Sequence, residues 1–165
     1  MADLYAFLDL EGIEGEAQDS KYEKKIELQS VSWGASNTSS FGSGTGASVT
    51  KGDIHEISFS KPMCKASMRI FERCVNGQHF KKGKLTLCKL AGDNNKIPYY
   101  EIDMKHVTIT SYQMSASDGG QLPMETGSIH FVQVETKYLP QSNEGDASGN
   151  IGFGWDLQRN EKLQA

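Results

Sequence analysis

Apolar residues recur at every second position along much of this chain, and this alternation constrains the fold more than any other feature. At the start, Leu4, Leu8 and Leu10 alternate with Tyr5 and Asp9. Side chains two residues apart face the same side of a β-sheet, so the alternation predicts a strand. Further strands are expected at residues 25–35, 49–59, 84–90, 99–114, 128–138 and 151–157. The strand at 25–35 should place Ile26, Leu28, Ser30 and Ser32 on one face.

The apolar phase slips by one residue within two of the expected strands. One slip lies between Met104 and Val107, and the other between Phe131 and Val132. A bulge or a sharp bend causes such a slip, and bends of that kind close sheets into barrels. The predicted class is therefore all-β: an antiparallel β-barrel or two-sheet sandwich with one helix.

Residues 61–75 change to the period of an α-helix. One face of this segment carries Met63, Ser67, Ile70, Phe71 and Cys74, and the opposite stripe carries Lys65, Arg69 and Arg73. Ser60 suits the N-cap, Pro62 the first turn, and Gly77 the end of the helix. We expect the single helix of the fold here, flanking the sheets.

Length and composition indicate one domain spanning residues 1–165, with 37% hydrophobic residues to build its core. No apolar run approaches the roughly 18–20 residues of a membrane-spanning helix, so no membrane insertion is expected. The first residues lack the basic leader of a signal peptide, so synthesis in the cytoplasm without one is expected. Cys64, Cys74 and Cys88 form no paired motif and are expected to be reduced, mostly buried thiols.

Charge is distributed unevenly behind a net charge of -4. Residues 61–89 hold eight lysines and arginines against Glu72 alone, whereas residues 1–27 hold eight acids and three bases. The basic segment could contact nucleic acid, but the negative total and the lack of clustered aromatic residues argue against that partner. Two further interpretations remain: a solvated helix face, or a contact with the acidic N-terminal region of a neighbouring copy.

The residues show no convincing catalytic, cofactor or metal site. GSGTGA at 42–47 fits a loose dinucleotide-binding pattern, but no apolar strand immediately precedes it and no helix follows, which indicates a flexible connector. The histidines are scattered, at His55, His79, His106 and His130. Glu101 and Asp103 share a strand face, where a solvated edge is a commoner cause than paired catalytic carboxylates. We therefore expect neither an enzyme nor a bound cofactor.

Several stretches occur together in the order found in one family. They are GIEGEAQD at 12–19, VSWGAS at 31–36, ISFSK at 57–61, GQHF at 77–80, KLTLCKLAG at 84–92, TSYQ at 110–113, FVQVETKYLPQ at 131–141 and GWDLQRN at 154–160. The chain thereby resembles the haemolysin-coregulated protein (Hcp) family, which forms the inner tube of type VI secretion systems. The methionine, cysteine and cation content of residues 61–74 departs from the family pattern.

The resemblance implies a ring-forming β-barrel protomer, hexameric rings stacked into a hollow tube, and the spike, sheath and baseplate proteins of the system as partners. Such a tube is propelled from the cytoplasm into a target cell and carries or chaperones effectors in its lumen. Some family members carry a toxic enzyme domain after the barrel, and this sequence stops five residues after Asn160. The alternative is a free-standing β-barrel that binds a small ligand without enzymatic activity.

Three sets of residues are candidates for this function. The flexible loop at 36–48 is expected to reach an adjacent subunit or ring through Asn37, Thr38, Ser39, Ser40, Phe41, Gly42, Ser43, Gly44, Thr45 and Gly46. Ser30 and Ser32 are expected to face the lumen, although a partly exposed strand end would also explain these serines. Lys65, Arg69 and Arg73 are expected to form a charged face between protomers.

Overall fold

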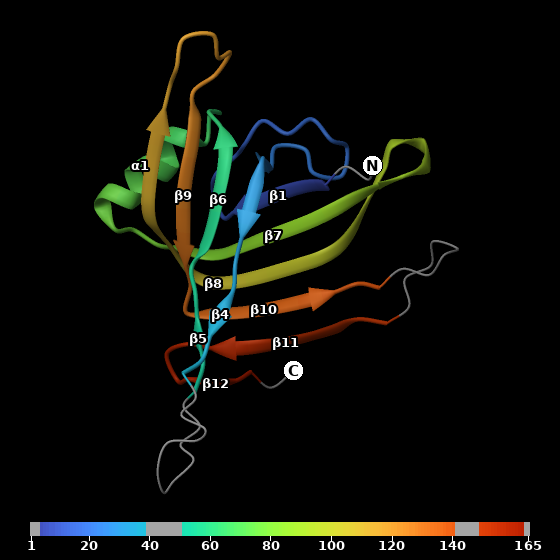
Figure 1. The fold of residues 1–165 in the computed structure, drawn as a ribbon, viewed down its shortest axis with the longest axis vertical. Helices are drawn as coiled ribbons and strands as arrows, with labels where there is room; N and C mark the ends of the chain where they lie inside the picture. Colours follow the sequence, from blue (N-terminus) through green and yellow to red (C-terminus); the bar gives the residue numbers. More distant parts are fainter. Residues whose placement is uncertain (1–3, 39–50, 141–148, 164–165) are drawn as a thin grey trace, which may run out of the picture.

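The computed structural model of the chain describes residues 4–38, 51–140 and 149–163. They form β-strands, one α-helix and one 3-10 turn (Figure 1). In chain order the elements are β1 (Leu4–Leu10), β2 (Ile26–Leu28), β3 (Ser30–Ser32), β4 (Ala35–Ser36), β5 (Asp53–Ile54), β6 (Ile57–Pro62), α1 (Ser67–Asn76), β7 (Phe80–Ala91), η1 (Gly92–Asn94), β8 (Asn95–Ser115), β9 (Met124–His130), β10 (Gln133–Tyr138), β11 (Ile151–Asp156) and β12 (Glu161–Lys162).

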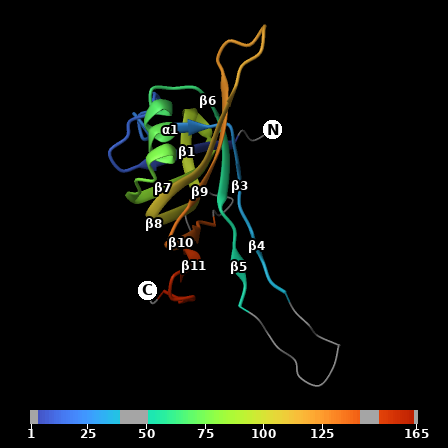
Figure 2. The same cartoon turned by 90° about the vertical axis from the view of Figure 1, so that its left-hand side faces the viewer.

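Antiparallel strands build two sheets that share β8. Sheet A has the order β12-β11-β10-β8-β7-β1-β2, and sheet B consists of β3, β6, β9 and the last part of β8. The separate pair β4 and β5 forms a narrow arm that projects from the body (Figure 2). The all-β class, the antiparallel pairing and the single α-helix are confirmed. The predicted barrel closure is wrong, because the strand pairings among the described residues form no closed circuit: β2 pairs only with β1, and β3 only with β6.

The two predicted phase slips are the corners at which the chain crosses from one sheet to the other. β8 pairs with β10 up to Lys105 and with β9 from Thr108 onward, and His106 between them has a positive φ of 54°. Phe131 and Val132 form the second corner, between β9 and β10. The two corners touch, since the Val132 N–H donates to the Lys105 carbonyl at 3.1 Å.

The expected strand at 25–35 also crosses between sheets. Ile26 and Leu28 are buried in sheet A, whereas Ser30 and Ser32 are exposed on sheet B. The crossing occurs at Gln29, whose N–H donates to the Ser60 carbonyl at 2.8 Å. The two-residue period was predicted correctly. The four side chains nevertheless differ in exposure, because Ile26 and Leu28 belong to sheet A and Ser30 and Ser32 belong to sheet B.

The helix begins later than predicted. Lys61 and Pro62 are the last residues of β6, paired with Glu125 and Met124 of β9, so the predicted N-cap at Ser60 is wrong. α1 spans Ser67–Asn76 and ends at Gly77, whose φ of 70° is the left-handed conformation that glycine adopts readily.

The core fills the space between sheet A, sheet B and α1. Leu8 and Leu10 from sheet A, Phe59 from sheet B and Ile70 from α1 belong to one buried cluster. Among the cysteines, which are all free, Cys88 is buried, and Cys64 and Cys74 are half-buried.

A buried ion pair fastens α1 to sheet B. The Lys61 Nζ lies 2.5 Å from the Glu125 Oε2, and both side chains are completely buried. The Ser67 hydroxyl accepts from the Lys61 Nζ at 2.9 Å and donates to Glu125 at 2.8 Å, while the Tyr112 hydroxyl donates to the other carboxylate oxygen. Burial and this carboxylate raise the pKa of Tyr112. Each charge is therefore compensated inside the core.

Replacing Glu125 with alanine should lower the free energy of unfolding by about 3–5 kcal/mol, because Lys61 would become a buried cation without its counter-ion. The double replacement Lys61→Met/Glu125→Leu should recover most of this loss, since it leaves no buried charge unpaired. Denaturant unfolding followed by circular dichroism measures both. Arg69→Ala, which breaks an exposed pair with Glu72, is the control and should change little. An equal loss in Glu125→Ala and Arg69→Ala would contradict the role of the buried pair.

Candidate functional site

Uncharged polar side chains cover the face of sheet B that is turned away from the core. Strand pairing arranges them in two rows across the sheet, Ser30, Ser60, Thr126 and Gln113 in one and Ser32, Ser58, Ser128 and Ser111 in the other. All eight are exposed or half-buried. The residues between them along each strand, such as Phe59, point to the core. We call these eight residues the hydroxyl face.

Hydrogen bonds join two pairs of side chains within the hydroxyl face. The Ser30 and Ser60 hydroxyls lie 2.5 Å apart, as do those of Ser111 and Ser128. Ser128 also bonds to Thr110 at 2.9 Å, and Thr110 donates to the Glu56 carboxylate at 2.8 Å. These side chains surround a shallow hollow of about 380 Å³. A serine nucleophile needs a base within hydrogen-bond reach, and the Ser30, Ser60 and Ser111 hydroxyls bond to other hydroxyls instead.

A glycine on β9 makes room for a core side chain beneath the hydroxyl face. A Cβ on Gly127 would lie 2.7 Å from the Phe59 ring, closer than real Cβ atoms approach a neighbour. Phe59 can therefore pack across β9 only because residue 127 has no side chain.

Two of the eight residues of this face, Ser30 and Ser32, could be predicted from the sequence. Ser30 and Ser32 do lie side by side on it, exposed to solvent. The other six were missed, although Ser58 and Ser60 in ISFS and Thr126 and Ser128 in ETGSI show the same alternation of hydroxyl residues along a strand. Alternating hydroxyls in several strands were the available signal.

The predicted cationic face makes contacts within the chain. The Lys65 Nζ lies 3.5 Å from the Glu14 carboxylate, and the Lys65 backbone N–H donates to the Glu16 carboxylate at 3.3 Å. The basic and acidic segments therefore already meet in one protomer. Arg73 donates to the His79 carbonyl at 3.0 Å and lies over the Phe80 ring. Arg69 pairs with Glu72 on the same helix.

The carboxylates considered as a catalytic pair form ion pairs with a lysine. Glu101 and Asp103 both pair with Lys84, at 3.5 and 3.9 Å. Within the described ranges, no group of three or more histidine, cysteine or acidic side chains comes together as a metal site would require. Asn37 and Thr38 of the predicted contact loop are exposed, whereas Ser39 to Gly46 and the GSGTGA motif lie outside the described residues.

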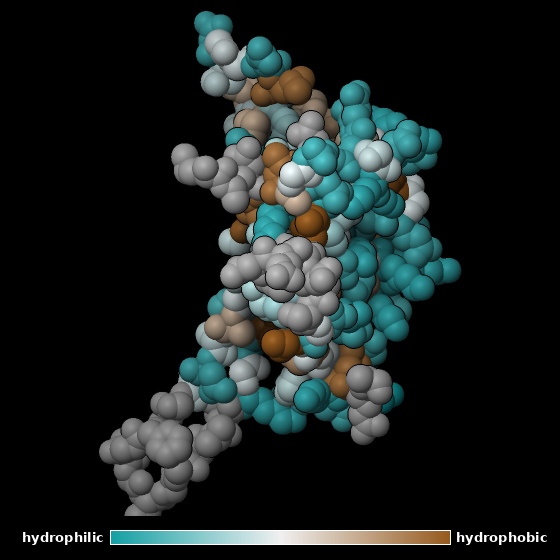
Figure 3. Space-filling model, turned by 90° about the vertical axis from the view of Figure 1, so that its right-hand side faces the viewer, coloured by the Kyte–Doolittle hydropathy of each residue, from teal (hydrophilic) through white to brown (hydrophobic). Residues whose placement is uncertain are grey.

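Two exposed apolar surfaces lie on different sides of the molecule. The helix patch consists of Met68, Phe71 and Val75, which are 56%, 45% and 76% exposed. The strand patch consists of Tyr138, Ile151 and Phe153, which are 48%, 68% and 49% exposed. α1 and the paired ends of β10 and β11 lie on opposite sides in Figure 1. Figure 3 shows the side of the β10 and β11 ends, where hydrophobic areas interrupt the hydrophilic surface.

The strand patch lies beside a buried hydroxyl group, because Phe153 pairs with Thr136 of β10. The Thr136 Oγ1 is buried and has no hydrogen-bond partner among the described residues.

No helix in the described part of the chain is long and apolar enough to cross a membrane. Residues 7–138 match the family described as "Type VI secretion system effector, Hcp". Protein hcp1 of Pseudomonas aeruginosa is 30% identical over 155 residues, covering 93% of this chain and 95% of that protein.

Solved structures agree with that match. A type six secretion system protein superposes with a TM-score of 0.90 at 33% identity, covering 98% of this chain and 100% of the other. Hcp1 from Salmonella typhimurium shares the fold with a TM-score of 0.76 at 24% identity, covering 99% and 100%.

Proposed function

Because the chain belongs to the Hcp family of type VI secretion system proteins, we propose that its copies form hexameric rings that stack into a hollow tube. The observation that carries this proposal is the hydroxyl face, an exposed sheet surface that bears no charge. In the tube this face lines the channel. Synthesis takes place in the cytoplasm, and the spike, sheath and baseplate proteins of the system are the partners of the tube before it is propelled into a target cell.

The two apolar patches support assembly into a ring. Exposed apolar surface on a folded protein is a common mark of an interface. Two different patches on different sides favour a head-to-tail contact, in which the helix patch of one protomer meets the strand patch of the next. Head-to-tail contacts close into a ring when the rotation per subunit allows it.

Phe71→Asp and Phe153→Asp should each reduce ring formation strongly, because each places a charge in an apolar contact. Light scattering coupled to size-exclusion chromatography measures the mass of the particles. Leu90→Asp, at an exposed apolar residue outside both patches, is the matched control and should assemble like the parent. Normal rings in both phenylalanine variants would contradict this interface.

The hydroxyl face supports carriage of effectors through the channel. Small hydroxyl side chains leave the surface smooth, and they offer hydrogen bonds without selecting cargo by charge. The carried effectors are therefore proteins held by many weak polar contacts. The free-standing ligand-binding barrel is less well supported, because core side chains fill the space between the sheets.

Ser32→Phe should lower the amount of effector retained by purified rings, because a large ring on the hydroxyl face narrows the channel and removes a polar contact. Co-purification of a tagged effector measures retention, and electron microscopy checks that rings persist. Ser20→Phe, at an exposed position outside the face, is the control. Equal retention in both variants would remove the hydroxyl face from the cargo site.

The loop at residues 37–46 is proposed to bind an adjacent subunit or ring. The arm formed by β4 and β5 supports this role, because it carries the chain away from the two sheets toward this loop (Figure 2). Both strands of the arm contain exposed residues.

Deleting residues 37–46 should leave single rings intact but reduce their stacking, since the ring contacts proposed above lie elsewhere. Negative-stain images of tube length against protein concentration measure the effect. The full-length chain is the reference. Tubes of unchanged length would contradict the role of the loop.

A further inference from the structure

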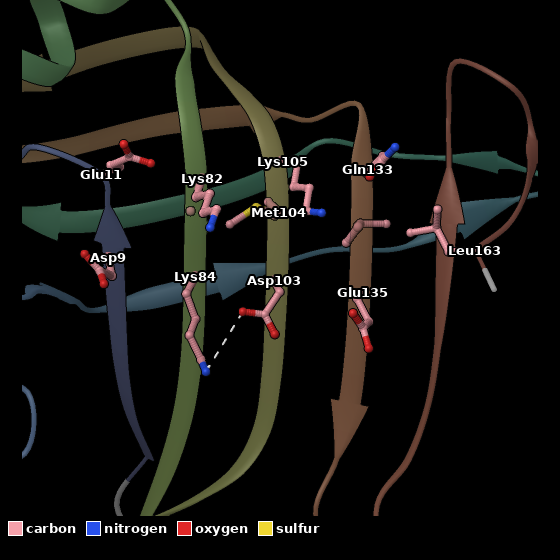
Figure 4. Close-up of a pocket in the computed structure, with 12 residues that line it drawn as sticks. Asp9, Glu11, Lys82, Lys84, Asp103, Met104, Lys105, Gln133, Glu135 and Leu163 are labelled. Carbon is pink, nitrogen blue, oxygen red and sulfur yellow. Dashed lines mark ion pairs between the residues drawn. The ribbon is translucent and has the colours of Figure 1, made fainter. Parts of the chain in front are cut away.

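The outer face of sheet A carries a groove of about 590 Å³ on the side of the core opposite to the hydroxyl face. β1, β7, β8 and β10 form its floor, and Leu163, after β12, lines one side (Figure 4). Leu163 packs closely on Gly154, where a Cβ would lie 3.0 Å from the leucine Cβ. The groove is thus a feature of the folded protomer, and it does not depend on ring formation.

Like charges face each other directly in two neighbouring rows of this groove. In one row Lys82 of β7 is paired in register with Lys105 of β8. In the next row Asp103 of β8 is paired in register with Glu135 of β10. Like charges at directly opposite positions destabilise a sheet. The folded protomer therefore carries two unfavourable pairs of opposite sign, side by side.

The acidic pair is partly compensated within the chain, and the basic pair is not. Asp103 lies 3.9 Å from the Lys84 Nζ, and Glu135 lies 3.8 Å from the Lys137 Nζ. Lys82 and Lys105 are exposed, and neither forms an ion pair in the described part of the chain, although Glu11 lines the same groove beside Lys82. Their ammonium groups are available to an external acid.

The arrangement defines what kind of molecule fits. Rows two residues apart along a strand are separated by about 7 Å, which is the spacing of alternate side chains in an extended peptide. A nucleic acid strand would meet Asp103 and Glu135 beside the lysines and be repelled. A segment that carries an acidic residue and a nearby basic residue would compensate both rows.

We propose that this groove docks an extended protein segment of bipolar charge. An acidic side chain of the segment lies between Lys82 and Lys105, and a basic side chain lies beside Asp103 and Glu135. An apolar residue of the segment packs against Leu163. Complementary charge fixes the register of the segment in the groove.

Fluorescence anisotropy with four probes of equal length tests the proposal: a peptide with an acidic and a basic half, a uniformly acidic peptide, a uniformly basic peptide and a single-stranded oligonucleotide. The parent protein should bind the bipolar peptide at least about tenfold more tightly than the other three. Equal or tighter binding of the uniformly acidic peptide or the oligonucleotide would overturn the proposal in favour of a general anion site.

Charge reversal in the groove should change which peptide the protein binds most tightly. Lys82→Glu/Lys105→Glu makes both rows acidic, so this variant should lose the bipolar peptide and gain the uniformly basic one. Lys65→Glu/Arg69→Glu makes the same change in net charge at Lys65, just before α1, and at Arg69 within it, and should keep the parent preference for the bipolar peptide. An equal effect of the two double variants would show that net charge alone is responsible, and would overturn the proposal.

The neutral variant Lys82→Gln/Lys105→Gln keeps the test decisive if the charge-reversed variant Lys82→Glu/Lys105→Glu fails to fold. It should unfold at the same or a higher temperature than the parent, because it removes a repulsion, and still bind the bipolar peptide about tenfold more weakly. Parent-like binding in this folded variant would overturn the proposal. Ring formation by the same variants is measured separately, so a failure of the groove is distinguishable from a failure of the tube.

Discussion

The passage of β8 from one sheet to the other is the constraint on which the rest of the structure depends. One continuous strand of 21 residues pairs with β7 and β10 before the corner and with β9 after it. The left-handed backbone at His106 makes that change of direction. Since Val132 bonds to Lys105, the β9 to β10 connection turns at the same place. The two sheets are therefore held at a fixed angle, and their outer faces point away from each other.

This separation gives the protomer two outer sheet faces of different chemistry. The outer side of sheet B has only neutral polar groups in its two rows, whereas the outer side of sheet A is striped with charge. The only buried ion pair among the described residues, Lys61 with Glu125, lies in the core and contributes charge to neither surface.

The strand pattern could be predicted from the sequence because alternation depends only on neighbours along the chain. The two slips near Met104 and Phe131 even located the corners. The start of α1 could not be predicted, since Lys61 looks like an exposed helical cation until Glu125, far away in sequence, is placed opposite it. The hydroxyl face was found only in part for the same reason. Ser30 and Ser128 become members of one surface only when the three strands β3, β6 and β9 are aligned.

The composition of the hydroxyl face has a consequence for the compartments that the protein meets. Serine, threonine and glutamine side chains neither gain nor lose a proton in the range that cells maintain. The rows that run through Ser30 and Ser32 therefore keep the same protonation state on both sides of a membrane, whatever the acidity there. An effector carried as proposed above would therefore be neither bound nor released by a change of pH, and its discharge would have to come from dilution or from the separation of the subunits.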